Sequence, residues 1–109
     1  MAYNEVLTQR VRELLAGAPD VKEKKMFGSI GFIVNGKLCI GVGDHPDHNM
    51  MVRVGLQQYQ EALSHPGASP AIMRGREQPG YVFLVSEAVT SQEDLQYWVD
   101  LALRYNAEL

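Results

Sequence analysis

Two histidines and two aspartates stand close together in one short segment, and their side chains are ligands that transition metals accept. Asp44, His45, Asp47 and His48 combine carboxylate and imidazole groups, which suit zinc and related ions. Five adjacent positions rarely wrap a tetrahedral shell, however, and no second ligand cluster appears elsewhere in the sequence. We therefore interpret residues 44–48 as a polar loop and expect neither a metal nor another cofactor.

Three arginines form a second candidate site, this time for a small anion. Arg53 is a charge within an otherwise apolar segment, and Arg74 and Arg76 precede the last apolar segment. Guanidinium groups bind carboxylates and phosphates through paired hydrogen bonds, so these arginines, with Tyr81, would form an anion site if the fold brings them together. The alternative is that Arg53 extends its charge to solvent from a sheet edge or pairs with a nearby carboxylate.

No residue is assigned a catalytic role. Cys39 is expected in mid-strand opposite an apolar residue, where burial raises the thiol pKa, so we interpret it as a packing residue. The glycines at residues 41–43 lack the third glycine and the following helix of a dinucleotide site. No strand-turn-helix nucleophile elbow surrounds any serine.

Size and composition indicate one cytoplasmic domain spanning residues 1–109. A single cysteine excludes an internal disulfide and suits a reducing compartment, and the start of the chain lacks the features of a secretory signal. No apolar run approaches the ~20 residues of a membrane-spanning helix. The formal net charge of −3 argues against direct binding to nucleic acid, which depends on basic residues. We expect no membrane or nucleic-acid partner.

Apolar residues at helical spacing predict three helices. The first covers residues 4–16, with Asn4 as its N-cap, and a short one covers residues 57–63. Ser91 followed by Asp94 resembles a capping box and predicts the start of the final helix.

An Asn-Gly pair at residues 35–36 separates two apolar runs and predicts a hairpin with a two-residue turn. Such a turn predicts the register, in which Val34 faces Lys37, Ile33 faces Leu38, Phe32 faces Cys39, Gly31 faces Ile40, Ile30 faces Gly41 and Ser29 faces Val42. Both faces of this hairpin are then apolar. Residues 50–54 and 81–85 predict two more strands, and residues 65–80 a long loop.

The order of these elements carries a specific set of sequence words. They are Lys24, Lys25, Met26, Phe27 and Gly28, then Val34-Asn35-Gly36, Met51-Val52-Arg53-Val54-Gly55, Tyr59, Pro66-Gly67-Ala68, Gly75-Arg76 and Gly80-Tyr81-Val82. Together they resemble the TfoX/Sxy family, and specifically its N-terminal domain standing alone without the C-terminal domain of longer members. The resemblance implies an α+β fold in which an antiparallel β-meander is flanked by N-terminal and C-terminal helices. It also implies kinship with bacterial regulators of natural competence, and no catalytic mechanism.

The apolar character of both hairpin faces predicts association. Two substantial helices and one short one do not easily cover both sides of such a sheet, whereas a second copy would. We therefore expect a non-enzymatic regulatory or interaction domain that forms a homodimer, with Ile30, Phe32 and Cys39 on the uncovered face, and that is able to engage a protein partner. The alternative is a protein or enzyme that binds a small anion or metabolite through Arg53, Arg74 and Arg76. The motif at residues 24–28 is either a partner-binding edge or a structural bend into the hairpin.

Overall fold

One antiparallel sheet and three α-helices make up the described part of the chain. The computed structural model describes residues 5–26 and 28–109. Its elements are α1 (Glu5–Leu14), β1 (Val21–Met26), β2 (Ser29–Val34), β3 (Lys37–Gly43), β4 (Met50–Arg53), α2 (Gly55–Leu63), β5 (Ala68–Met73), β6 (Arg76–Leu84), the short 3-10 helix η1 (Ser86–Val89) and α3 (Gln92–Asn106). The expected N-cap Asn4 and the motif residue Phe27 lie outside the described residues.

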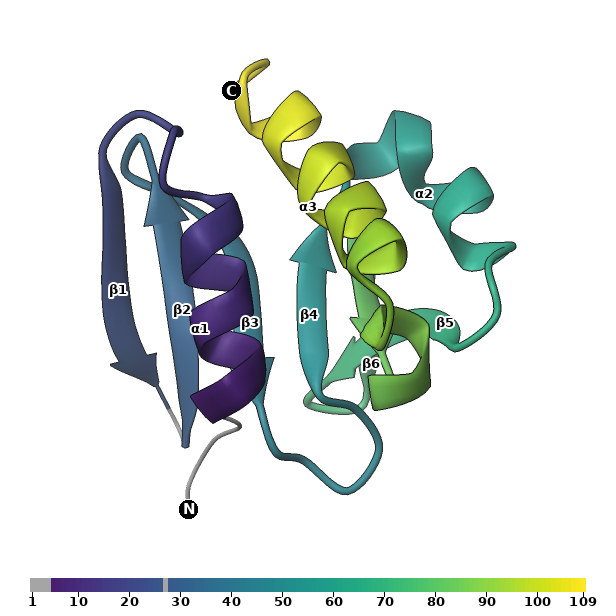
Figure 1. Cartoon of the computed structure of the whole chain (residues 1–109). Coiled ribbons are helices and arrows are strands. Elements are labelled where there is room, and N and C mark those ends of the chain that lie inside the picture. Colours follow the sequence, from purple (N-terminus) through teal and green to yellow (C-terminus); the bar gives the residue numbers. More distant parts are fainter. Residues whose placement is uncertain (1–4, 27) are drawn as a thin grey trace.

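The six strands are arranged in the order β1-β2-β3-β4-β6-β5, and every neighbouring pair is antiparallel. The three helices lie on one face of this sheet, with α1 in front of β2, α3 along β3 and β4, and α2 against β5 and β6 (Figure 1). The α+β fold and its antiparallel sheet with terminal helices are therefore confirmed.

The hairpin between β2 and β3 begins as predicted and then departs from the predicted register. Asn35 and Gly36 both have positive φ, 53° and 76°, as a two-residue turn of this type requires. Ile33 pairs with Leu38 as expected, but the next pair is Phe32 with Ile40 because Cys39 is an extra residue on β3. The predicted pairs beyond Ile33 are wrong, since a β-bulge shifts the register by one residue and reverses the face of every later side chain.

The burial of each side chain shows which face of the sheet the helices cover. Ile30, Phe32 and Cys39 belong to the hydrophobic core and are only 4%, 0% and 1% exposed. The expectation that these three residues lie on an uncovered face is thus corrected. The face that the helices leave uncovered carries other residues instead, among them Gly41 and Met51, which pair with each other across β3 and β4.

The predicted long loop at residues 65–80 is a second hairpin. Strands β5 and β6 are joined at Arg74 and Gly75, whose φ angles of 55° and 74° repeat the geometry of the first turn. An arginine at positive φ is unusual, and prolines at positions 70 and 79 suggest a loop, so the sequence pattern concealed the strands.

The C-terminal helix α3 packs against β3 and β4 of the sheet. Its start is as predicted, because the Ser91 side chain accepts a hydrogen bond from the Asp94 backbone N–H at 3.0 Å. Near its end Asn106, which is 6% exposed, donates its side-chain N–H to the Val34 carbonyl at 3.1 Å. This bond ties α3 to the tip of the β2–β3 hairpin.

Candidate functional site

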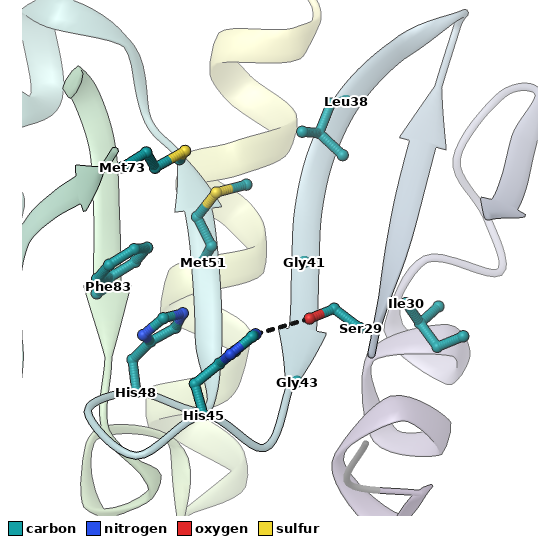
Figure 2. Close-up of a pocket in the computed structure, with 10 residues that line it drawn as sticks. All are labelled: Ser29, Ile30, Leu38, Gly41, Gly43, His45, His48, Met51, Met73 and Phe83. Carbon is teal, nitrogen blue, oxygen red and sulfur yellow. Dashed lines mark hydrogen bonds between the residues drawn. The ribbon is translucent and has the colours of Figure 1, made fainter. Parts of the chain in front are cut away.

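The sheet face that carries no helix, which we call the open face, holds a depression of about 390 Å³. Its floor is formed where Gly41 and Gly43 leave β3 without side chains, and one side is formed by Met51, Met73 and Phe83 from the other strands (Figure 2). Gly41 pairs with Met51, and Met51 pairs with Phe83, so small and large residues stand side by side in one cross-strand row. The open face is therefore a trough beside a ridge.

Ser29 and the two loop histidines close one end of the depression. The Nε2 atom of His45 lies 2.8 Å from the Ser29 hydroxyl oxygen, across the strand position of Gly43 (Figure 2). A β-carbon on Gly43 would come within 2.4 Å of that oxygen, so this glycine is required for the contact. The imidazole of His48 stacks between His45 at 4.6 Å and Phe83 at 3.6 Å, measured between ring centroids.

The four residues considered as metal ligands make contacts with other residues of the same chain. His48 Nδ1 is 2.8 Å from an Asp47 carboxylate oxygen, and the Asp44 carboxylate accepts a long hydrogen bond from Asn49. Burial lowers the pKa of His48, and the hydrogen bond to Asp47 opposes this shift only in part. Within residues 5–26 and 28–109, no three potential ligands converge on one point. The segment is an ordered polar loop that covers Phe83.

The arginines predicted to form an anion site are not brought together. The Arg53 guanidinium lies over two phenol rings, 5.4 Å from the centre of Tyr81 and 5.5 Å from that of Tyr105. Arg76 begins β6, five positions before Tyr81, which corresponds to about 16 Å of strand. Arg53 thus has Tyr81 beside it as expected, whereas Arg74 and Arg76 occupy the distant β5–β6 turn.

Cys39 and the motif at residues 24–28 are the other positions that the sequence singled out. Burial raises the pKa of the Cys39 thiol to about 11, which fits its interpretation as a packing residue. Lys24 and Lys25 are exposed on β1, the edge strand, and Gly28 has a φ of 79° at the bend into β2. Nothing is described of Phe27 or of the Met26 side chain.

Sequence reasoning missed the features that shape the open face. The stack of His48 on Phe83 joins residues far apart in the chain, and no local pattern predicts it. The trough did leave a signal, because Gly41 and Gly43 alternate along one strand and therefore point to the same side. The register expected from the turn placed Gly41 opposite Ile30, whereas the bulge at Cys39 places it opposite Gly31.

Fold and open face define a class of small α+β domain in which helices cover one side of an antiparallel sheet. The family model of the TfoX N-terminal domain matches residues 13–105 of the 109-residue chain. The chain belongs to the TfoX N-terminal domain family. No curated protein and no solved structure matches it significantly. Among the described helices, none is long and apolar enough to cross a membrane.

Proposed function

We propose that this chain is a non-enzymatic regulatory domain of the cytoplasm that forms a homodimer by packing two open faces together. The observation that carries the proposal is the one-sided helix cover, which leaves Leu38, Met51 and Met73 half-buried on the opposite face (Figure 2). Family membership supports the regulatory part, because the family's named members regulate competence. The Cys39 thiol is buried and its pKa is raised to about 11, so it is a poor nucleophile, which supports the non-enzymatic part.

The ridge and the trough of the open face suit a second copy of the same chain. A two-fold axis places the same surface on both sides of an interface, so a surface that fits itself needs a projection next to a matching hollow. Met51 and Met73 project beside the trough at Gly41, and rotation by 180° would set the ridge of each copy into the trough of the other. Methionine suits such a contact because its flexible thioether adapts to irregular space.

The edges of the sheet support association through the face. Strand β1 carries exposed Lys22, Lys24 and Lys25, and charged side chains on an edge strand oppose pairing with a further strand. At the opposite edge, β5 contains Pro70, which has no backbone N–H to offer to a neighbouring strand. Both edges thus disfavour extension of the sheet. By their register Lys22 and Lys24 lie at the β1 margin of the open face, and the centre of that face around Gly41 and Met51 is apolar.

The size of the open face sets the expected strength of the dimer. Six strands about 4.8 Å apart and about 20 Å long present roughly 500 Å² before side-chain relief is counted. This is below the ~800 Å² per partner of a standard interface. We therefore expect a dimer that dissociates in the micromolar range and responds to protein concentration.

Sedimentation velocity over a hundredfold range of concentration tests the proposal. We expect the wild-type chain to shift from monomer to dimer, and Met51→Lys to remain monomeric because it places a charge in the interface. Leu56→Lys is the matched control, since Leu56 is 71% exposed and lies at the start of α2, outside the open face. A wild-type chain that stays monomeric throughout, or a Leu56→Lys variant that dissociates as readily as Met51→Lys, would contradict the proposal.

Arg53 supports a second candidate function, the binding of a small anion. Its guanidinium makes no ion pair within the described residues and lies between two tyrosine rings beside the backbone of Gly55 and Gly80. This would make a site for a phosphate or carboxylate with one arginine in place of the three that were expected. Thermal stabilisation by millimolar phosphate that is lost in Arg53→Met would support it, and equal stabilisation of both proteins would contradict it.

A further inference from the structure

A second groove of about 390 Å³ lies on the helix side of the molecule, at the start of α3. Its walls come from His65 and Pro66 after α2, from η1 and from the first turns of α3. Aromatic rings form part of these walls. The His65 ring lies 4.5 Å from the Tyr97 ring and 5.6 Å from the Trp98 ring, measured between centroids, and the Tyr97 and Trp98 rings meet edge to face.

Three carboxylates line the same groove without a positive partner. Glu87, Glu93 and Asp94 are exposed, and none of them makes an ion pair within the described part of the chain. The guanidinium of Arg10 lies near the end of η1 but donates to the carbonyls of Val89 and Thr90, at 3.0 and 3.2 Å. The groove therefore presents negative charge next to aromatic faces, which favours a cation.

Trp98 supplies an independent indication of a ligand. The residue is only 2% exposed, and its indole N–H donates to no group in residues 5–26 and 28–109. No fully enclosed side-chain nitrogen in this part of the chain lacks a partner, so the indole N–H must reach solvent. Trp98 lines this groove, and its indole N–H, which reaches solvent and has no partner in the described residues, is available to an acceptor on a bound molecule.

We propose that this groove binds an arginine side chain on a segment of a partner protein. A guanidinium is planar, so it would stack on the ring of Tyr97 while its edge donates to Glu93 or Glu87. The backbone carbonyl of the same segment would accept from the Trp98 indole N–H. Arginine fits better than lysine because only its planar group uses the ring face and the carboxylates together. This site is separate from the open face and does not depend on dimer formation.

The chain contains a single tryptophan, so Trp98 reports on its own groove. The probe is N-acetyl-arginine amide, and the readouts are the indole N–H resonance in a nitrogen-correlated spectrum and the intrinsic fluorescence. We expect a saturable shift of the indole resonance with a dissociation constant of about a millimolar, as befits one side chain in an open groove. N-acetyl-citrulline amide has the same shape without the charge, and we expect no saturable shift with it.

Variants test the role of the carboxylates. We expect Glu87→Gln combined with Glu93→Gln to weaken binding of the arginine probe at least threefold. Glu5→Gln is the matched control, because Glu5 is also an acidic residue in the first turn of a helix but lies on α1. Binding of arginine and citrulline probes with equal affinity, unchanged binding by the double variant, or no saturable response to the arginine probe would each overturn the proposal.

Discussion

Met51 lies directly opposite Gly41 on the neighbouring strand, and a β-carbon added to Gly41 would lie 3.7 Å from the Met51 methyl carbon. That separation is an ordinary van der Waals contact. The backbone of Gly41 is also outside the left-handed region, so neither packing nor conformation within one chain requires a glycine there. A larger residue would fit at position 41, yet the residue there is glycine. The missing side chain keeps the trough open, as a trough that receives a partner requires.

Substitution of Gly41 should therefore separate folding from association. We expect Gly41→Ala to leave the free energy of unfolding unchanged or to raise it by up to about 1 kcal/mol, because the unfolded chain loses freedom. Gly41→Leu should fill the trough and weaken the dimer at least tenfold. Chemical denaturation and sedimentation velocity measure the two effects. Gly17→Ala, in open space outside the sheet, is the control, and a Gly41→Leu dimer of wild-type strength would refute this role.

Two other glycines allow conformation and space to be measured separately. Gly55 and Gly36 have nearly equal φ angles of 79° and 76°, but a β-carbon on Gly55 would lie 2.3 Å from the Tyr105 ring, whereas Gly36 faces open space. We expect Gly36→Ala to cost about 1 kcal/mol of stability through backbone strain alone. Gly55→Ala should cost a further 1–3 kcal/mol, roughly, through overpacking. If thermal denaturation shows equal losses of stability in Gly36→Ala and Gly55→Ala, the Tyr105 ring moves aside at no cost in free energy.

Asn106 should be important for stability although it lies near the end of the chain. Its side chain is buried and donates to the Val34 carbonyl at 3.1 Å. Asn106→Leu leaves that carbonyl without its donor, and we expect a loss of about 1–3 kcal/mol in the free energy of unfolding. Asn106→Asp should destabilise at least as much near neutral pH, because a carboxylate would face the carbonyl. A neutral effect of Asn106→Leu in urea denaturation would mean that water replaces the bond.

The stack of His48 on Phe83 should make stability depend on pH. Burial lowers the folded-state pKa of His48, so the unfolded state binds protons more readily as the pH falls through the ordinary histidine range, and stability decreases there. We expect the melting temperature to fall between pH 7.5 and pH 5.5. His48→Phe keeps a ring on Phe83 and removes the titration, so its melting temperature should fall less. An identical pH dependence in both proteins would assign the effect to other groups.

Local signals predicted much of this fold. Asn35 and Gly36 indicated their turn because their residue types favour positive φ, and Ser91 with Asp94 indicated the start of the last helix. Both are interactions between residues close in sequence. The α+β class followed from the order of such elements and from the family resemblance.

An uncovered sheet face was predicted, but the residues that form it were not, because they depend on interactions across the sheet. The bulge at Cys39 arises in the pairing of β2 with β3, and it places Ile40 rather than Cys39 opposite Phe32. The β5–β6 hairpin was hidden because Arg74 adopts a conformation that residue type does not favour. Tyr105 reaches Arg53 from the far end of the chain, which no local pattern indicates.

Contacts between two copies of the chain would test the central claim most directly. In a mixed sample, one copy carries ¹³C-labelled methionine methyl groups and the other is unlabelled, and an isotope-filtered nuclear Overhauser experiment records only contacts between copies. We predict cross-peaks from the methyl groups of Met51 and Met73 to the α-protons of Gly41. A dimeric sample in which the methyl groups of Met51 and Met73 show no cross-peaks to the other copy would contradict an interface formed by the open face.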